Sequence, residues 1–427
     1  MFALATIKTP GDLPSGGISR PASTPPRRSQ LADDAGGFIE DKIQPSLADL
    51  PEEVRRNLSE TASGWRKPTQ LQSHATVGDV MTQDWNRRLQ AAFKEKGRER
   101  NRPVRLPSPL TMAVAGEGDH ATIELTDRAV IGNMQENASA FEGWCLALHF
   151  WCGASVSLRW KAPVAGNTEP TAKEKVEARH YQRFLYRVER FKSLFPDWFH
   201  IAPVDPNALR AALIAKSPIL NIAGDRTQKA GSRSATTSKT SPEYDLESRL
   251  LEDQDFDRFF GFGPSAHKDR QFPVGLFSSQ VLRDNAIFPG GKGAIDLVCL
   301  DGKHLWLFEL KAGGNIPIGT VTELIFYTSV LRDAQMGHFK FADGLSGHTV
   351  KTDHVGALEA VKAVMLGDDL HPLLSDAGIL TLLNEAAELR WNNAAKAPHV
   401  SFKAAQIMNS ERPVPTHVPL LFEARGG

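Results

Sequence analysis

Two short apolar runs joined by a tight turn constrain this chain more than any other segment. The runs cover residues 294–300 and 304–312, and both are rich in β-branched, aromatic and leucine side chains. Asp301-Gly302 between them is a two-residue hairpin signal. The segment therefore predicts a β-hairpin.

Charged side chains interrupt this otherwise apolar hairpin at defined places. With Asp301-Gly302 as the loop, Asp296 would pair with Leu307, and Ala294 with Glu309. Side chains alternate along a strand, and cross-strand partners share a face. Asp296, Glu309 and Lys311 are therefore expected on one face, whereas an odd loop would move Asp296 to the other face.

Two carboxylates and a lysine at this spacing are suited to phosphodiester hydrolysis. Mg²⁺ or Mn²⁺ bound by Asp296 and Glu309 would neutralise phosphate charge and lower the pKa of a bound water. The carbonyl of Leu310 is a candidate further oxygen ligand, and Lys311 would orient the water or hold the phosphate. The alternative is an ordinary surface hairpin, although charges rarely interrupt such apolar runs without a partner or a task.

Asp296 followed by Glu309-Leu310-Lys311 resembles the PD-(D/E)XK phosphodiesterase superfamily of restriction enzymes, repair nucleases and recombination exonucleases. The resemblance covers residues 243–340 well and the rest of the C-terminal part loosely. It implies an α/β fold, with a restriction-endonuclease-like αβα sandwich around a mixed central sheet. The periodicity of residues 242–407 (helix, hairpin, helix, strand, helix and strand) predicts the same class.

A third carboxylate lies upstream, in a segment with a good helix start at Ser241-Pro242. Glu247 falls in the middle of the apolar face formed by Tyr244, Leu246, Leu250 and Leu251. The resemblance implies that an acid of this helix joins the metal site, and Glu247 matches that position best. The alternative is a first-turn acid favoured by the helix dipole.

Downstream, Glu323 and Tyr327 are four residues apart on an expected helix and share a face. The pair resembles the Gln-x-x-x-Tyr helix of one branch of the superfamily, with Glu323 in place of the Gln. That branch acts on DNA ends or single strands, which makes both residues candidate substrate contacts. Thr320 and Glu323 also fit a capping box, and Tyr327 also fits core packing.

Lys292 lies in Gly290-Gly291-Lys292-Gly293, directly before the first acid. The spacing is not that of a phosphate-binding P-loop. Lys292 is a candidate phosphate contact, and an ordinary loop is the alternative.

Composition shifts divide the chain into four parts. Residues 1–37 are expected to form a disordered tail, 38–223 a separate mixed α+β N-terminal domain, 224–241 a flexible linker and 242–427 the nuclease-like domain. In the N-terminal domain the pattern predicts helices at 77–95 and 134–149 and strands at 121–125 and 155–160. Farther on it predicts strands at 361–366 and 400–407 and a helix at 377–390.

A basic stripe marks the end of the N-terminal domain: Arg179, Arg183, Arg187 and Arg190 recur at helical spacing among aromatic residues. Such a stripe is typical of a solvated helix face. The alternative is a surface that follows a nucleic-acid backbone.

The formal net charge is zero, so any nucleic-acid footprint must be local. The three cysteines are too few and too scattered for a disulfide framework or a zinc site. With no apolar stretch long enough to cross a bilayer, we expect a cytoplasmic protein without a membrane partner.

The expected function is that of a Mg²⁺- or Mn²⁺-dependent nuclease that acts on nucleic acid, most simply DNA, in restriction and anti-phage defence or in repair. The N-terminal domain would set specificity or mediate homo-oligomer or protein contacts. One alternative is an inactive nuclease fold that serves as a nucleic-acid-binding or scaffold module. Another is an enzyme acting on other phosphate esters.

Overall fold

All residues that the structure describes lie in the unit Ser46–Gly427. The computed structural model describes residues 77–96, 104–163, 169–201, 213, 217–222, 242–289, 293–312, 317–342, 347–394, 396–408 and 422–425. The predicted tail at 1–37 and the predicted linker at 224–241 lie outside these ranges. No helix within them combines the length and apolar character needed to cross a membrane.

A six-stranded mixed sheet organises the C-terminal half, with strand order β13-β12-β11-β9-β8-β6. Strand β11 is parallel to both β9 and β12, whereas β8 is antiparallel to its neighbours β9 and β6. The strands span His267–Pro273 (β6), Ala294–Asp301 (β8), His304–Lys311 (β9), Ala360–Gly367 (β11), His399–Ile407 (β12) and Phe422–Arg425 (β13). The strands predicted at 361–366 and 400–407 are therefore confirmed.

The predicted hairpin is present as β8 and β9, but its turn lies one residue later than expected. Asp301 pairs with His304, so Gly302 and Lys303 form the two-residue loop. Gly302 adopts φ +60°, a left-handed conformation open to glycine. Type II′ turns place glycine at the first loop position, and this preference outweighs the preference for Asp-Gly as the two loop residues.

This correction moves the cross-strand partner of Asp296 by two positions. The predicted pairing with Leu307 is wrong, because Leu307 pairs with Val298 and the ladder continues to Leu297 and Phe308. One further step in the same register puts Asp296 opposite Glu309. A shift by an even number of residues keeps every side chain on its predicted face.

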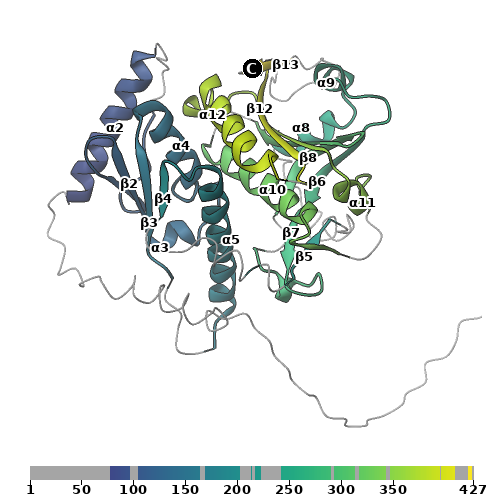
Figure 1. Ribbon diagram of the computed structural model, residues 1–427, viewed down its shortest axis with the longest axis horizontal. Coiled ribbons are helices and arrows are strands. Elements are labelled where there is room, and N and C mark those ends of the chain that lie inside the picture. Colours follow the sequence, from purple (N-terminus) through teal and green to yellow (C-terminus); the bar gives the residue numbers. More distant parts are fainter. Residues whose placement is uncertain are drawn as a thin grey trace, which may run out of the picture. The chain divides into compact units, whose positions relative to one another are not determined.

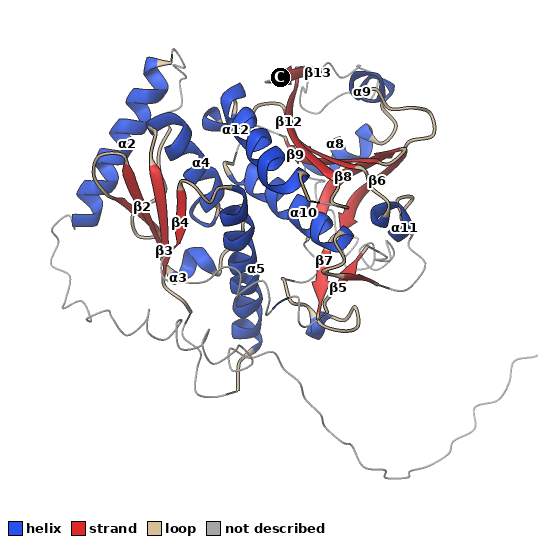
Figure 2. Ribbon diagram, viewed as in Figure 1, coloured by secondary structure: helices blue, strands red, loops and turns tan. Residues whose placement is uncertain are grey.

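Helices cover both faces of this sheet, which makes the C-terminal half a layered α/β structure (Figures 1 and 2). Helices α8 and α9 share one apolar cluster with the strands, and α10 and α12 share another with the opposite face. These helices span Pro242–Leu250 (α8), Gln254–Phe260 (α9), Gly319–Gln335 (α10), Thr352–Gly356 (α11) and Ala377–Ala387 (α12). The helix predicted at 377–390 begins as expected after Asp376, which caps it through Gly378 N at 2.9 Å, and passes into a π-helical turn after Ala387.

A four-stranded mixed sheet, order β1-β2-β3-β4, forms the N-terminal half with its own helices. The bounds are Val77–Glu95 (α2), Met112–Ala115 (β1), His120–Leu125 (β2), Asp127–Val130 (α3), Phe141–Cys152 (α4), Ser155–Trp160 (β3), Ala172–Leu194 (α5) and Phe199–Ile201 (β4). The predicted helix at 77–95 and both predicted strands are confirmed. The helix predicted at 134–149 begins only at Phe141, because a 3₁₀ turn at Asn137–Ser139 precedes it.

The two halves share packing and strand pairing. One apolar core runs from Trp85 in α2 to Ala404 in β12. A small third sheet, order β10-β5-β7, joins Ile219–Asn221 (β5) to Gly275–Phe277 (β7) and Lys340–Phe341 (β10). The described residues on both sides of the predicted linker therefore pack together.

Three of the four arginines of the stripe on α5 are buried, so the interpretation of the stripe as a solvated face is wrong for them. Arg179, at the start of the stripe, is half-buried and donates to the carbonyl of Asp284 at 3.1 Å. Arg183, Arg187 and Arg190 are each no more than 5% exposed. Arg187 Nε donates to Glu142 at 2.8 Å, and Arg190 Nη1 donates to Asp333 at 3.1 Å. Arg187 and Arg190 thus pair with acids on α4 and α10. The local sequence of α5 does not indicate these pairs, because the acids lie on other helices.

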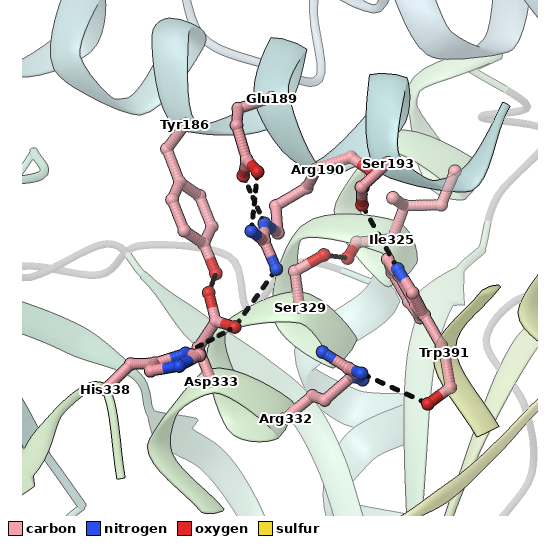
Figure 3. A network of polar contacts seen from close by, with 10 residues as sticks. All are labelled: Tyr186, Glu189, Arg190, Ser193, Ile325, Ser329, Arg332, Asp333, His338 and Trp391. Carbon is pink, nitrogen blue, oxygen red and sulfur yellow. Dashed lines mark hydrogen bonds and ion pairs between the residues drawn. The ribbon is translucent and has the colours of Figure 1, made fainter. Parts of the chain in front are cut away.

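Figure 3 shows the network around Arg190 and Asp333, which joins α5 to α10. Arg190 contacts Glu189 on its own helix and Asp333 on α10, and Tyr186 Oη donates to Asp333 at 2.9 Å. His338 Nδ1 lies 3.3 Å from the same carboxylate. A buried carboxylate held by several partners fixes the distance between two helices, because it cannot lose one partner without exposing a charge to an apolar interior.

Arg190→Ala should lower the free energy of unfolding by about 3–5 kcal/mol, because it leaves buried carboxylates without their cation. Urea denaturation followed by circular dichroism measures the change. The control is Arg390→Ala: Arg390 pairs with Asp197 at 2.9 Å with side chains 35% and 75% exposed, and surface pairs contribute about 0–1 kcal/mol. Equal losses in the two variants would contradict a structural role for the buried network.

Candidate active site

The three polar residues of the hairpin meet as predicted. Asp296 Oδ2 accepts a hydrogen bond of 2.9 Å from the amide of Leu310. Lys311 Nζ lies 2.6 Å from Glu309 Oε1. Glu309 is 1% exposed and Lys311 4% exposed, so the hairpin carries a buried cluster of opposite charges. Leu310 stands between them with its side chain in the apolar cluster under α8, and a ligand role for its carbonyl stays a prediction.

Helix α10 brings Glu323 into the same cluster. Glu323 Oε2 lies 3.5 Å from Lys311 Nζ, and Glu323 Oε1 accepts a 2.6 Å hydrogen bond from Gln135 Nε2. The capping-box alternative is wrong, because the N-cap of α10 is Ile318 and no side chain caps it. Thr320 instead donates to the carbonyl of Pro317 at 3.0 Å.

Tyr327 lies one turn farther along α10 and belongs to the core. It is 2% exposed, and its hydroxyl donates to the carbonyl of Ala294 at 3.2 Å. The bond ties α10 to β8 two residues before Asp296. Core packing, the alternative reading of Tyr327, therefore describes its position better than direct contact with a substrate does.

Glu247 reaches the cluster from α8, through a residue that the sequence did not single out. Gln271 Nε2 donates to Glu247 Oε1 at 2.8 Å and lies 3.4 Å from Asp296 Oδ1. Glu247 is 4% exposed, which matches its predicted place on the apolar face of the helix. Lys292, the remaining candidate, lies outside the described residues.

Gln271 and Gln135 are the site residues that sequence analysis missed. Neither is charged and neither belongs to a motif. Gln135 is 188 positions away from Glu323 along the chain, and no local pattern predicts a contact at that separation. The one available signal was indirect: buried carboxylates require donors, and neutral amides supply them without adding charge.

Burial, with repulsion between neighbouring carboxylates, raises the pKa values of Asp296, Glu247 and Glu309. Burial raises the pKa of Asp296 to about 6, with Lys311 opposing the shift and Glu323 adding to it. Burial and then the charge of Asp296 raise the pKa of Glu247 to about 7. Burial, Asp296 and Glu323 together raise the pKa of Glu309 well above its ordinary value. Acids with such raised pKa values cluster at functional sites, since burying several like charges destabilises a fold.

Lys311 behaves in the opposite way. Burial lowers the pKa of its ammonium, but Glu309, Glu323 and Asp296 outweigh that effect and hold the pKa well above its ordinary value. Lys311 therefore stays protonated through the neutral range. Its ammonium can serve as a point charge toward an anion, but not as a base.

Three carboxylate oxygens in this cluster have no hydrogen-bond donor: Oε2 of Glu247, of Glu309 and of Glu323. Buried carboxylate oxygens without a hydrogen-bond donor are ligands that a hard cation prefers, although Glu323 Oε2 also forms an ion pair with Lys311 at 3.5 Å. However, among the described residues no group of three or more His, Cys, Asp or Glu side chains is arranged to hold a metal ion. The ammonium of Lys311 and the amide of Gln271 lie between the acids.

Comparison with protein families, with curated proteins and with solved structures found no match for this chain. The function of the chain is therefore inferred from the geometry and electrostatics of the cluster.

The raised pKa of Glu247 predicts how stability changes with pH. Between an unfolded value of about 4.3 and a folded value of about 7, the folded protein holds a proton that the unfolded chain has lost. The contribution of Glu247 to the free energy of unfolding is fully present below about pH 4 and is lost as the pH rises through about 7. Between pH 4.5 and 7.5 the free energy of unfolding of Glu247→Gln should therefore rise by about 1–3 kcal/mol relative to that of wild type. Urea denaturation in EDTA measures this difference.

Glu359→Gln is the control, because the Glu359 carboxylate bonds Lys303 at 2.6 Å on the surface and its pKa is lowered. A lowered pKa changes stability with pH in the opposite direction. The free energy of unfolding of Glu359→Gln should therefore not rise relative to that of wild type as the pH rises. If the stability difference between Glu247→Gln and wild type does not change with pH, the carboxyl of Glu247 does not have a raised pKa in the folded protein.

Proposed function

We propose that this protein is a metal-dependent nuclease that hydrolyses phosphodiester bonds of DNA through the cluster around Lys311. The observation that carries the proposal is a buried lysine with Asp296, Glu309 and Glu323 around it. A fourth acid, Glu247, joins Asp296 through the amide of Gln271. No structural requirement of the fold explains four acids there, because an apolar cluster of similar volume would be at least as stable.

The order of the elements supports a restriction-endonuclease-like αβα sandwich. Helix α8 precedes strand β6 and the β8–β9 hairpin, α10 follows, and β11 then lies parallel to β9. The acids stand on the first helix, on both hairpin strands and on the helix that follows. The resemblance to the PD-(D/E)XK superfamily implies acids on the first helix and on both hairpin strands, whereas the related branch carries Gln where this chain has Glu323.

Asp296, Glu309 and Glu247 are the residues that would hold Mg²⁺ or Mn²⁺, with Glu323 as a further acid. The donor set is all oxygen, which suits a hard cation better than zinc. When bound, such an ion supplies Lewis acidity and a water of lowered pKa. Its charge would also lower the pKa values of Asp296 and Glu247, which burial now raises.

The protein's own groups have separate roles in this proposal. The Leu310 amide fixes the orientation of Asp296 through its 2.9 Å bond. Lys311, protonated at neutral pH, would contact the scissile phosphate and offset its charge. That role requires Lys311 to exchange Glu309 Oε1, now at 2.6 Å, for the phosphate, which frees Glu309 as a ligand.

A second function is favoured by one specific observation. The 2.6 Å contact between Lys311 and Glu309 closes the cluster on itself, and no cation site is preformed in the described residues. A protein that kept the fold and used these charges only for stability would look the same. In that case the chain is a nucleic-acid-binding or scaffold module on an inactive nuclease fold.

Cleavage assays separate the two functions. Linear, circular and single-stranded DNA, and RNA, are incubated with Mg²⁺ or Mn²⁺ and with wild type, Asp296→Asn or Lys311→Met. We expect cleavage by wild type and at least an about 100-fold loss in both variants, since each removes a charge at the reacting centre.

Lys303→Met is the matched control, because Lys303 lies in the loop of the same hairpin with its side chain 61% exposed. It should keep wild-type activity. Binding of nucleic acid without cleavage in either metal would support the scaffold function, and equal cleavage by all variants would place the activity elsewhere.

A further inference from the structure

Gln271 adopts a backbone conformation that glutamine rarely adopts. Its φ is +51°, in the left-handed region. It lies within β6, where Arg270 pairs with Leu297 and Phe272 pairs with Ile295, so the ladder with β8 is interrupted only at Gln271. The position opposite the interruption is Asp296. A non-glycine residue held this way in the middle of a strand persists only where its surroundings compensate for it.

The compensating contacts are made by the side chain. Its amide nitrogen donates to Glu247 Oε1 at 2.8 Å and lies 3.4 Å from Asp296 Oδ1. These carboxylates come from different elements, α8 and β8, and repel each other. One neutral amide group therefore lies between the two carboxylates.

We propose that Gln271 is a positioning residue of this site: its strained backbone aims a neutral amide that holds Glu247 beside Asp296 in the place where a divalent cation is bound. The inference rests on the proposed function for the cation, and it assigns a role that no motif of the sequence indicates. Gln271 does not contact the reacting groups. It acts through Glu247 and Asp296.

A neutral group is suited to this role in a way that a charged one is not. A lysine at this point would neutralise the acids and compete with a cation, as Lys311 does for Glu309. An alanine or glycine would leave two repelling carboxylates free to move apart. An amide satisfies one carboxylate oxygen and adds no charge, so the pair keeps its affinity for a cation.

The competing explanation is local: Gln271 only closes an irregularity in β6, and its contacts with the acids are incidental. The two explanations differ for Gln271→Gly. Glycine adopts positive φ without steric strain, so the strand conformation is retained while the amide is lost. A local role predicts no change in cation binding, whereas a positioning role predicts weaker binding in a protein at least as stable.

Lys396→Gly is the matched control, because Lys396 is also a non-glycine residue with positive φ, at +69°, and is exposed away from the cluster. Mn²⁺ binding to the full chain is measured by isothermal titration calorimetry, and the unfolding midpoint by a thermal melt in EDTA. We expect Gln271→Gly to bind Mn²⁺ about 10- to 100-fold more weakly, with an unfolding midpoint no lower than that of wild type. Lys396→Gly should bind like wild type.

Gln271→Asn gives a second test if the glycine variant folds poorly. Asparagine tolerates the left-handed region and keeps an amide, but its side chain is one methylene shorter. It should fold and also lose affinity for Mn²⁺. Equal Mn²⁺ affinity in wild type, Gln271→Gly and Gln271→Asn would overturn the role of Gln271 and leave the proposed function standing. No Mn²⁺ binding by wild type itself would overturn both.

Discussion

The burial of several carboxylates around one lysine is the constraint on which the rest of this structure depends. Glu309, Glu323 and Lys311 are each no more than 4% exposed. Glu247, Glu309 and Glu323 each keep one carboxylate oxygen without a hydrogen-bond donor. Three features offset the cost of burying these carboxylates: the Lys311 ammonium, the amides of Gln271 and Leu310, and raised pKa values that favour the neutral carboxyl. Each is a response that a bound cation would make unnecessary.

Helix α10 couples this cluster to the N-terminal half. Its first turns carry Glu323, which meets Gln135, and Thr322, which donates to Glu142 at 3.0 Å. A side chain at Gly319 would come within 2.8 Å of the Gln135 carbonyl, so this approach of backbones requires glycine. Toward its end the helix carries Asp333, held by Arg190. The N-terminal half therefore supports the helix that completes the cluster.

Local patterns predicted the parts of this arrangement that local chemistry determines. Alternation along two strands placed Asp296, Glu309 and Lys311 on one face, and helical periodicity placed Glu247 inward. The turn was misplaced by one residue, since Asp-Gly and Gly at the first loop position both suit a hairpin. The buried arginines of α5 were misread because their partners, such as Glu142, lie on other helices. Gln271 could not be foreseen, because its role depends on a positive φ that glutamine does not signal.

The most direct test of this account is the position of Mn²⁺ in a crystal of the protein, located by its anomalous scattering. The account predicts a peak bounded by carboxylate oxygens of Asp296 and Glu309, with Lys311 moved from its 2.6 Å contact with Glu309. A peak only elsewhere, or none at millimolar Mn²⁺ with that contact unchanged, would contradict the claim that these buried charges form a cation site.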